Sequence, residues 1–424
     1  MRIICGPETF NRPARDGALR IILYGQPGLS NRGSAGDAVK NELLRHRLEA
    51  APRAWDLLSI ALSVVTADFA GLRNQSPDGW TREFDLEVAV AEPAFWNGQT
   101  AALSAALAFL TTDRWNLRFY DGGMLPSQTR EIIRPENDCV MLLSGGLDSL
   151  VGAIDLTAAG LKPFAISQTV RGDADKQDRF ARKVGGGLNH LQLNHNANVP
   201  GVAETSQRAR SLIFITFGVL AATTLQRYHD GEVVPLYVCE NGFIAINPPL
   251  TGGRIGSLST RTAHPEFLCR VQNILDASGL QVLIRNPYGT KTKGEMLSNC
   301  ADQAVLKAEA SRSTSCGRFQ RFNYRHCGRC VPCQVRRAAF KAWGIQDNTT
   351  YVYELLGQND TDHANFDDVR SVAMALAAVD ADGFDAWVGS TLSSPMIEDT
   401  VALKDMVRRS LAELKELHRF YNVR

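Results

Sequence analysis

The stretch Cys139-Val-Met-Leu-Leu-Ser-Gly-Gly-Leu-Asp-Ser149 decides how this chain folds. Its apolar first half predicts a short buried strand over 139–143, and helical periodicity resumes over 148–159. Two glycines between them let a ligand approach the backbone closely, and the free amides at a helix start attract phosphate. The string therefore predicts a phosphate-binding loop. An ordinary turn capped by Ser149 or Asp148 is the alternative.

The polar side chains of this loop suit a nucleotide. Ser144 and Ser149 add hydroxyl donors, and Asp148 can orient a donor or help to hold a magnesium ion. No lysine stands where the Gly-x-x-x-x-Gly-Lys loop of kinases and ATPases needs one. The loop therefore belongs to a different class of nucleotide site.

Strands and helices alternate on the C-terminal side of this loop. We expect strands at 164–168, 188–193, 233–239 and 281–285, and helices at 174–184, 206–228 and 265–277. Alternation at this spacing is typical of right-handed crossovers and predicts an α/β fold with a doubly wound parallel sheet. A ligand of such a sheet lies over the carboxyl ends of the strands.

The flanks differ from this middle region and suggest three domains. Residues 1–137 mix strand-like runs (19–23, 84–90) with helical ones (55–67, 99–110), which predicts an N-terminal α+β accessory domain. Residues 138–345 form the expected nucleotide-binding domain. Residues 346–424 are predicted to be a helical extension that ends in an amphipathic stretch over 401–421.

Charge and hydropathy exclude some classes of protein. Lys plus Arg number 46 and Asp plus Glu 45, so the overall charge gives no nucleic-acid signal. The longest apolar segment, 211–224, is too short to span a bilayer, and the first residues do not resemble a secretory signal. We therefore expect a soluble, cytoplasmic protein without a membrane partner.

Four of the nine cysteines lie within one short segment: Cys316, Cys327, Cys330 and Cys333. Four thiolates with two-residue gaps can close a tetrahedral zinc site, and Gly328 supplies a tight turn. An iron–sulfur cluster and a persulfide-forming cysteine are the alternatives. Because all four positions are occupied, we expect a structural Zn²⁺ knot over 316–333, with His326 as a surface neighbour.

The string Ser144-Gly-Gly-Leu-Asp-Ser149 resembles the pyrophosphate loop (PP-loop) of the ATP pyrophosphatase superfamily. Enzymes of that superfamily cut ATP between the α- and β-phosphates and adenylate a substrate oxygen. The resemblance implies a PP-loop type of α/β fold and a site for ATP and Mg²⁺. Its residues would be Ser144, Gly145, Gly146, Leu147, Asp148 and Ser149.

This loop together with the cysteine motif resembles the 7-cyano-7-deazaguanine synthase family. Intermediate blocks agree with that family and extend the resemblance over about 138–344. They are Gln168 at a strand end, Arg210-Ser-Leu-Ile-Phe214, Pro265-Glu-Phe267 and Thr292-Lys-Gly-Glu295.

The family resemblance implies a reaction and an assembly. Such enzymes adenylate 7-carboxy-7-deazaguanine, capture it with ammonia as an amide, and activate the amide again to form the nitrile. They are homodimers with a structural zinc. By this resemblance Gln168 joins the ATP site, and Lys293 and Arg210 are the cations for phosphate or leaving pyrophosphate. The alternative for both cations is a solvated helix side chain.

The chain also departs from the family. The stretch 256–264 lacks the acidic residues that the family has there, while Glu240 is a natural acceptor for the adjacent donors of a guanine-like edge or a strand-end residue facing water. With its long flanks, the chain resembles the longer relatives in bacterial antiphage gene clusters, including Qat-type systems. That subgroup implies protein partners from the same cluster and, as nucleophile, either ammonia or a protein amine. A catalytically silent nucleotide-binding scaffold and a PP-loop tRNA-modifying enzyme are the alternatives.

Overall fold

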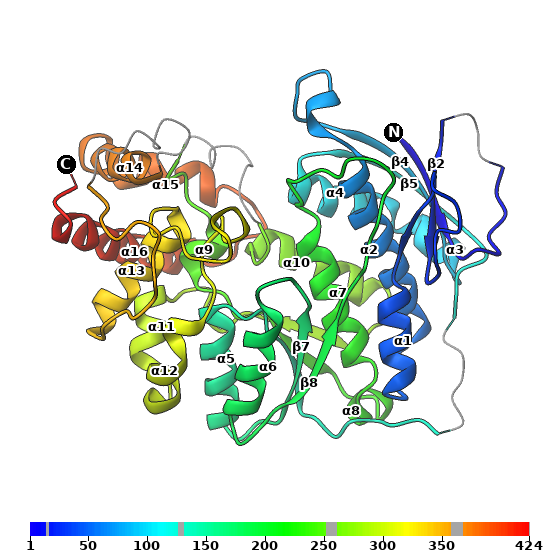
Figure 1. The fold of residues 1–424 in the computed structure, drawn as a ribbon, viewed down its shortest axis with the longest axis horizontal. Coiled ribbons are helices and arrows are strands. Elements are labelled where there is room, and N and C mark those ends of the chain that lie inside the picture. The colour runs from blue at the N-terminus through cyan, green and yellow to red at the C-terminus, as the bar shows by residue number, and fades with distance from the viewer. Residues whose placement is uncertain (14–16, 126–130, 252–260, 358–367, 424) are drawn as a thin grey trace.

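The computed structural model describes residues 1–13, 17–125, 131–251, 261–357 and 368–423. Its strands form two five-stranded sheets, and every strand pair within them is parallel. Figure 1 shows the first sheet at one side of the molecule and the C-terminal helices at the other. The second sheet lies between them and carries the loop after residue 143.

The first sheet has the order β3-β2-β1-β4-β5. Its strands are β1 (Arg2–Gly6), β2 (Leu19–Leu23), β3 (Gly33–Ala35), β4 (Glu83–Ala89) and β5 (Arg114–Tyr120). The helices α1 (Asp37–Arg45) and α2 (Pro52–Ala70) join β3 to β4, and α3 (Pro93–Gly98) and α4 (Thr100–Thr111) join β4 to β5. The prediction of an α+β first domain is therefore wrong, because its strands are parallel and helices connect them.

The second sheet confirms the predicted parallel α/β architecture and has the order β10-β9-β6-β7-β8. Its strands are β6 (Cys139–Leu142), β7 (Pro163–Gln168), β8 (Asn189–Leu193), β9 (Val234–Tyr237) and β10 (Val282–Arg285). The chain builds outward from β6 to β8 and then returns to the other side through β9. The strand order therefore reverses between β6 and β9, where a doubly wound sheet binds its ligand.

Helices cover both faces of the second sheet. On one face, Val140 and Leu142 pack in the same core cluster as Phe217 of α7 (Arg210–Ala222). On the other face, Met141 packs with Leu150 of α5 (Leu147–Ala158). The remaining helices of this region are α6 (Ala174–Lys183), α8 (Gln226–His229), α9 (Gly242–Ile246), α10 (Pro265–Ala277), α11 (Lys293–Asn299), α12 (Gln303–Glu309) and α13 (Val331–Trp343).

The first domain packs on the nucleotide-binding domain through helices. Side chains of α2, among them Trp55 and Leu58, belong to the same apolar cluster as those of α7. In Figure 1, α2 and α4 accordingly lie between the first sheet and the helices α7 and α10. The two sheets thus share one continuous hydrophobic core.

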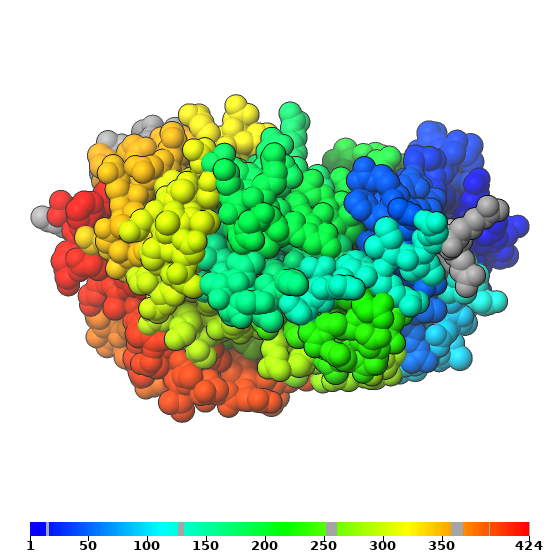
Figure 2. Space-filling view, turned by 90° about the horizontal axis from the view of Figure 1, so that it is seen from below, coloured from blue at the N-terminus to red at the C-terminus, as the bar shows by residue number. Residues whose placement is uncertain are grey.

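The C-terminal extension consists of α14 (Asp368–Asp382), α15 (Phe384–Val388) and α16 (Thr400–Phe420). These helices share an apolar cluster with α9 and α13. In the view from below, the N-terminal and C-terminal parts occupy opposite ends of an elongated body (Figure 2). Among the helices of the described residues, none is long and apolar enough to cross a membrane.

Candidate active site

A cavity of roughly 300 Å³ opens at the carboxyl ends of β6 and β9. It is lined by residues from the loop after β6, the end of β9, the starts of α7 and α11, and the cysteine segment. From the residues singled out by sequence it includes Ser144, Gly146, Leu147, Asp148, Ser149, Arg210, Glu240, Lys293 and Cys316. The cavity therefore brings together motifs that lie up to about half the chain apart.

The loop after β6 is closed by its own hydrogen bonds. Gly145 has φ +84°, a conformation that favours glycine. The Ser144 hydroxyl accepts from the Gly146 amide at 3.2 Å, and Ser149 Oγ donates to the Gly146 carbonyl at 3.0 Å. Helix α5 begins after Gly146, and no described side chain caps it. The alternative of a turn capped by Ser149 or Asp148 is therefore wrong, and the amides of the first turn are left without a side-chain cap.

Asp148 is buried at the centre of this arrangement, at 5% exposure. Its Oδ2 accepts from the backbone amide of Asn241 at 3.1 Å and from Asn241 Nδ2 at 2.7 Å, and its Oδ1 forms an ion pair with Lys293 Nζ. Burial alone would raise the pKa of Asp148, but the Lys293 ammonium and these hydrogen bonds lower it to about 2. Asp148 is thus a carboxylate held from two other elements.

Glu240 follows β9 and lies beside this pair. Its Oε1 is 3.3 Å from Asn241 Nδ2, which donates to it. Burial, and then the neighbouring Asp148 charge, raise the pKa of Glu240 well above its ordinary value. The raised pKa favours the protonated form of Glu240, which offers one donor and one acceptor.

Lys293 and Arg210 line the cavity from two helix starts. Lys293 is the first residue of α11, whose capping box is formed by Thr292 and Glu295. Its side chain is buried, so the alternative of a solvated helix side chain does not hold for Lys293. Arg210 begins α7 and is exposed.

The four predicted cysteine ligands form a buried cluster, and their Sγ atoms all lie within 4.8 Å of one another. Cys327 and Cys333 are 3.9 Å apart, and Cys330 and Cys316 are 3.8 Å apart. A zinc ion bound tetrahedrally at about 2.3 Å from each sulfur places the sulfurs about 3.8 Å apart, so the cluster fits zinc.

The backbone around the cluster supports this fit. The Cys327 amide points to Cys316 Sγ at 3.4 Å, and the Cys330 amide points to Cys327 Sγ at 3.2 Å. Gly328 has φ +87°, and a Cβ there would lie 2.3 Å from the Tyr353 carbonyl, so the predicted tight turn is confirmed. His326 is not a surface neighbour: it is buried, and its Nε2 accepts from the Ser315 amide at 3.1 Å.

Curated proteins resemble half of this chain. The 7-cyano-7-deazaguanine synthase of Brucella canis is 27% identical over 237 residues, which cover 50% of this chain and 92% of that protein. The corresponding synthase of Rhizobium etli is 27% identical over 241 residues, covering 50% and 91%. Over half its length, the chain is therefore similar to 7-cyano-7-deazaguanine synthases. No family model matches the chain.

This finding confirms the family resemblance drawn from the two motifs. The match takes in nearly the whole of each synthase but leaves half of this chain outside it. The departure from the synthases at 256–264 falls mostly outside the described residues.

Two residues expected at the ATP site, Gln168 and Gly145, take part in hydrogen bonds that hold the loop in place. Gln168 ends β7 and is buried, and its carbonyl accepts from Gln177 Nε2 at 3.0 Å. The same Gln177 nitrogen donates to the Ser144 carbonyl at 3.2 Å. The Gly145 carbonyl accepts from the Thr314 amide at 3.0 Å. The described lining of the cavity contains neither Gln168 nor Gly145.

Three site residues were missed from sequence: Asn241, Asp173 and Thr314. Asn241 follows β9 and Asp173 precedes α6, so the rule of carboxyl strand ends could have found both. Thr314 reaches the site through the long-range contact to Gly145, and its hydroxyl donates to Asp173 Oδ1 at 2.6 Å. No local pattern marks Thr314.

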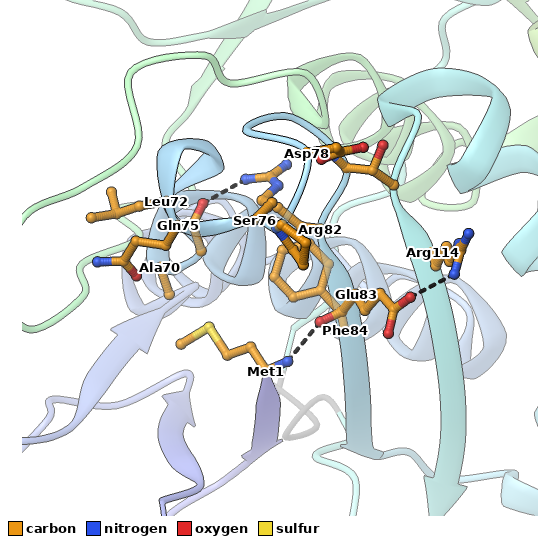
Figure 3. Close-up of a pocket in the computed structure, with 13 residues that line it drawn as sticks. Met1, Ala70, Leu72, Gln75, Ser76, Asp78, Arg82, Glu83, Phe84 and Arg114 are labelled. Carbon is orange, nitrogen blue, oxygen red and sulfur yellow. Dashed lines mark hydrogen bonds and ion pairs between the residues drawn. The ribbon is translucent and has the colours of Figure 1, made fainter.

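A larger hollow of roughly 620 Å³ lies at the amino ends of β4 and β5 in the first sheet (Figure 3). Several of its charged groups are engaged within the chain: Glu83 binds Arg114 at 2.7 Å, and the Met1 amino group donates to the Glu83 carbonyl at 2.6 Å. Arg82 is engaged by Asp113. Ligands of parallel sheets bind at carboxyl strand ends. The smaller cavity is therefore the better candidate site.

Proposed function

We propose that the chain adenylates the carboxylate of a 7-deazaguanine-type compound with ATP in the cavity at β6 and β9, and that a nitrogen nucleophile captures the product. One observation carries this proposal: the buried Asp148–Lys293 pair joins the phosphate-type loop to the start of α11, and Glu240 lines the same cavity. The name of the synthase relatives supports the substrate class.

The site residues have separate roles in this proposal. The uncapped amides of α5 and the Ser144 and Ser149 hydroxyls hold phosphate oxygens. Lys293 and Arg210 neutralise the charge that develops when pyrophosphate leaves. Glu240 binds the base edge.

Carboxylates on the cavity wall suit a magnesium ion. Asp148 and Asp173 both line the cavity and offer the oxygen ligands that Mg²⁺ takes. When bound, the ion would shield the phosphate charges. Asp148 is the first candidate to hold it, since this carboxylate is ionised at neutral pH.

The bonds change in two steps. An oxygen of the substrate carboxylate attacks the α-phosphorus, the bond to the bridging oxygen breaks, and pyrophosphate departs. An amine then attacks the acyl carbon, AMP leaves with the bonding electron pair, and the amine loses a proton. With ammonia the product is an amide, which a second activation converts to a nitrile. With a protein amine the product is a deazaguanine–protein conjugate.

The half of the chain outside the match supports the protein amine and a role in bacterial antiphage defence. A compact synthase needs no such flanks, whereas a protein acceptor needs a surface to dock on. The partners would be proteins from the same gene cluster. The same proposal includes that the chain acts in the cytoplasm as a homodimer.

The first experiment measures ATP turnover by the purified full chain with and without 7-carboxy-7-deazaguanine, separating AMP from ADP. Substrate-dependent AMP and pyrophosphate are expected. Asp148→Ala should abolish AMP formation and keep the fold, while Asp178→Asn, whose half-exposed side chain pairs with Arg182 on α6, should leave it unchanged. Absence of AMP from the unmodified chain would favour a silent scaffold, and retained turnover by Asp148→Ala would remove the PP-loop assignment.

The nucleophile is tested by mass spectrometry of partner proteins incubated with the chain, ATP and the same carboxylate. A mass increase on a partner amine is expected. Free amide or nitrile as the sole product, with all partners unmodified, would contradict conjugation and leave adenylation intact.

A further inference from the structure

Helix α16 lies beyond the segment 138–344 that resembles the synthases, yet it contacts elements on both sides of the cavity. Its Met406 packs in one cluster with Phe243 and Ile246 of α9. A Cβ on Gly242 would lie 2.8 Å from Met406 Cε, so the start of α9 is pressed against α16. Glu240 and Asn241 immediately precede this contact.

On the other side, Glu413 of α16 contacts the start of α11. Its carboxylate accepts from the Thr292 hydroxyl and from the Gly294 backbone amide. A Cβ on Gly294 would lie 2.5 Å from Glu413 Oε1, so a larger residue would separate the two helices. Glu413 therefore acts as a second cap on α11, supplied by another helix.

Arg409 extends this contact by one helical turn. Its Nε donates to Glu295 Oε1 at 2.6 Å, and its Nη2 donates to the Thr290 carbonyl at 3.0 Å. Glu295 is the acidic member of the capping box that starts α11. Arg409 thus holds both the backbone before α11, at Thr290, and the capping residue Glu295.

These contacts bear directly on Lys293, which is the first residue of α11. The positive end of a helix is an unfavourable place for an ammonium group. Carboxylates from Glu295 and Glu413 offset that field, while the rigid cap fixes where the lysine backbone begins.

We propose that Glu413 and Arg409 are positioning residues that hold Lys293 against Asp148, so that the ion pair in the cavity depends on the C-terminal extension. This inference rests on the proposed function for its catalytic consequence. The placement of Lys293 can be tested separately.

The first test measures how fast Lys293 is acetylated by an amine-reactive ester, using peptide mass spectrometry. In the unmodified chain Lys293 is buried and paired, so labelling is slow. Glu413→Gln and Arg409→Gln should each raise its rate several-fold. The matched control is Glu416→Gln on the same helix, because Glu416 pairs with Arg419 at the surface at 2.7 Å. An unchanged Lys293 rate in folded Glu413→Gln and Arg409→Gln would overturn the inference.

The second test measures steady-state AMP formation by the same variants. Glu413→Gln should lower kcat by roughly tenfold, the scale of a small misplacement of a catalytic group. The KM for ATP, the zinc content and the Tm should stay close to those of Glu416→Gln. Faster labelling with unchanged kcat would support the positioning of Lys293 and refute its catalytic consequence. Faster labelling in a chain that forms no AMP even when unmodified would support the positioning and reject the proposed function.

Discussion

The Lys293 ammonium pairs with Asp148, and this contact divides the two carboxyl groups of the site. It lowers the pKa of Asp148 to about 2 against the effect of burial. The pKa of Glu240 is raised by burial and then by the Asp148 charge. Of the two carboxyl groups, Asp148 carries the negative charge, and the Lys293 ammonium compensates it. A buried cavity tolerates this arrangement better than two negative charges beside one ammonium.

Glu240→Gln should raise Tm at neutral pH, because glutamine reproduces the neutral form of Glu240. The folded chain keeps the Glu240 proton, whereas the unfolded chain loses it above roughly pH 4.3. The stability that this proton contributes is therefore fully present below that pH and is lost as pH rises through the folded-state pKa. We expect a gain of a few degrees, since about 1 kcal/mol moves the Tm of a domain of this size by roughly 2–4 °C.

Melting curves of Glu240→Gln and the unmodified chain from pH 4 to pH 8 test this expectation. The difference in Tm should shrink toward pH 4. Glu398→Gln, at an exposed position, is the matched control. A difference that is constant over the range would contradict the assigned protonation.

At the scale of elements, the second sheet was predicted better than the first. Continuous apolar runs mark β6 and β7, which are buried on both faces, and the strands predicted at β8, β9 and β10 are also found. In β5 the exposed Arg114, Asn116 and Arg118 alternate with buried residues, and β3 has three residues in a loop-like context. Missing these two strands hid the parallel order of the first sheet.

The structure divides the segment that was predicted as one helix over 206–228, and the contacts at the break lie partly outside the local sequence. Helix α7 ends at Ala222 and α8 begins at Gln226. The Thr223 and Thr224 hydroxyls donate to the Leu220 and Ala221 carbonyls at 2.9 and 2.7 Å. Thr223 Oγ1 also accepts from the Ala51 amide of the first domain at 3.1 Å. The sequence pattern of the segment 206–228 gives no sign of this contact with Ala51.

The cysteine knot joins the start of α13 to the wall of the cavity, and its loss should destabilise both. Cys333 lies in the first turn of α13, and Cys316 lines the cavity. Thr314, two residues before Cys316, pairs with the loop at Gly145. A bound zinc ion therefore connects the start of α13 to the wall of the nucleotide cavity.

Cys330→Ser should abolish the binding of one zinc ion per chain, lower Tm by several degrees and weaken ATP binding. Removing one thiolate opens the tetrahedron, and metal binding energy in such sites is also folding energy. Elemental analysis and calorimetry provide the measurements. Cys269→Ser, at a cysteine outside the cluster, is the control. Full zinc content and a normal Tm in Cys330→Ser would refute the knot.

For the whole molecule, a buried ion network reinforces the shared core of the two sheets. Arg82 Nη2 binds Asp68 Oδ1 at 2.5 Å and Asp113 Oδ2 at 2.6 Å. The other oxygen of Asp68 accepts from the Ala209 amide at 2.9 Å. Ala209 is the residue before Arg210, so a carboxylate of the first domain binds the backbone just before the helix that carries a proposed phosphate cation.

This arrangement predicts that the first domain and the nucleotide-binding domain unfold together. Asp68→Asn should destabilise the chain by roughly 2 kcal/mol, as expected when a hydrogen bond to a charged group is lost. Because the core is continuous across α2 and α7, calorimetry should show one transition that moves to lower temperature as a whole. Asp85→Asn is the control, since Asp85 contacts Asn116 at the surface at 3.1 Å. Two separated transitions, with a shift in the first alone, would mean that the domains are independent and that α2 does not hold the start of α7 in place.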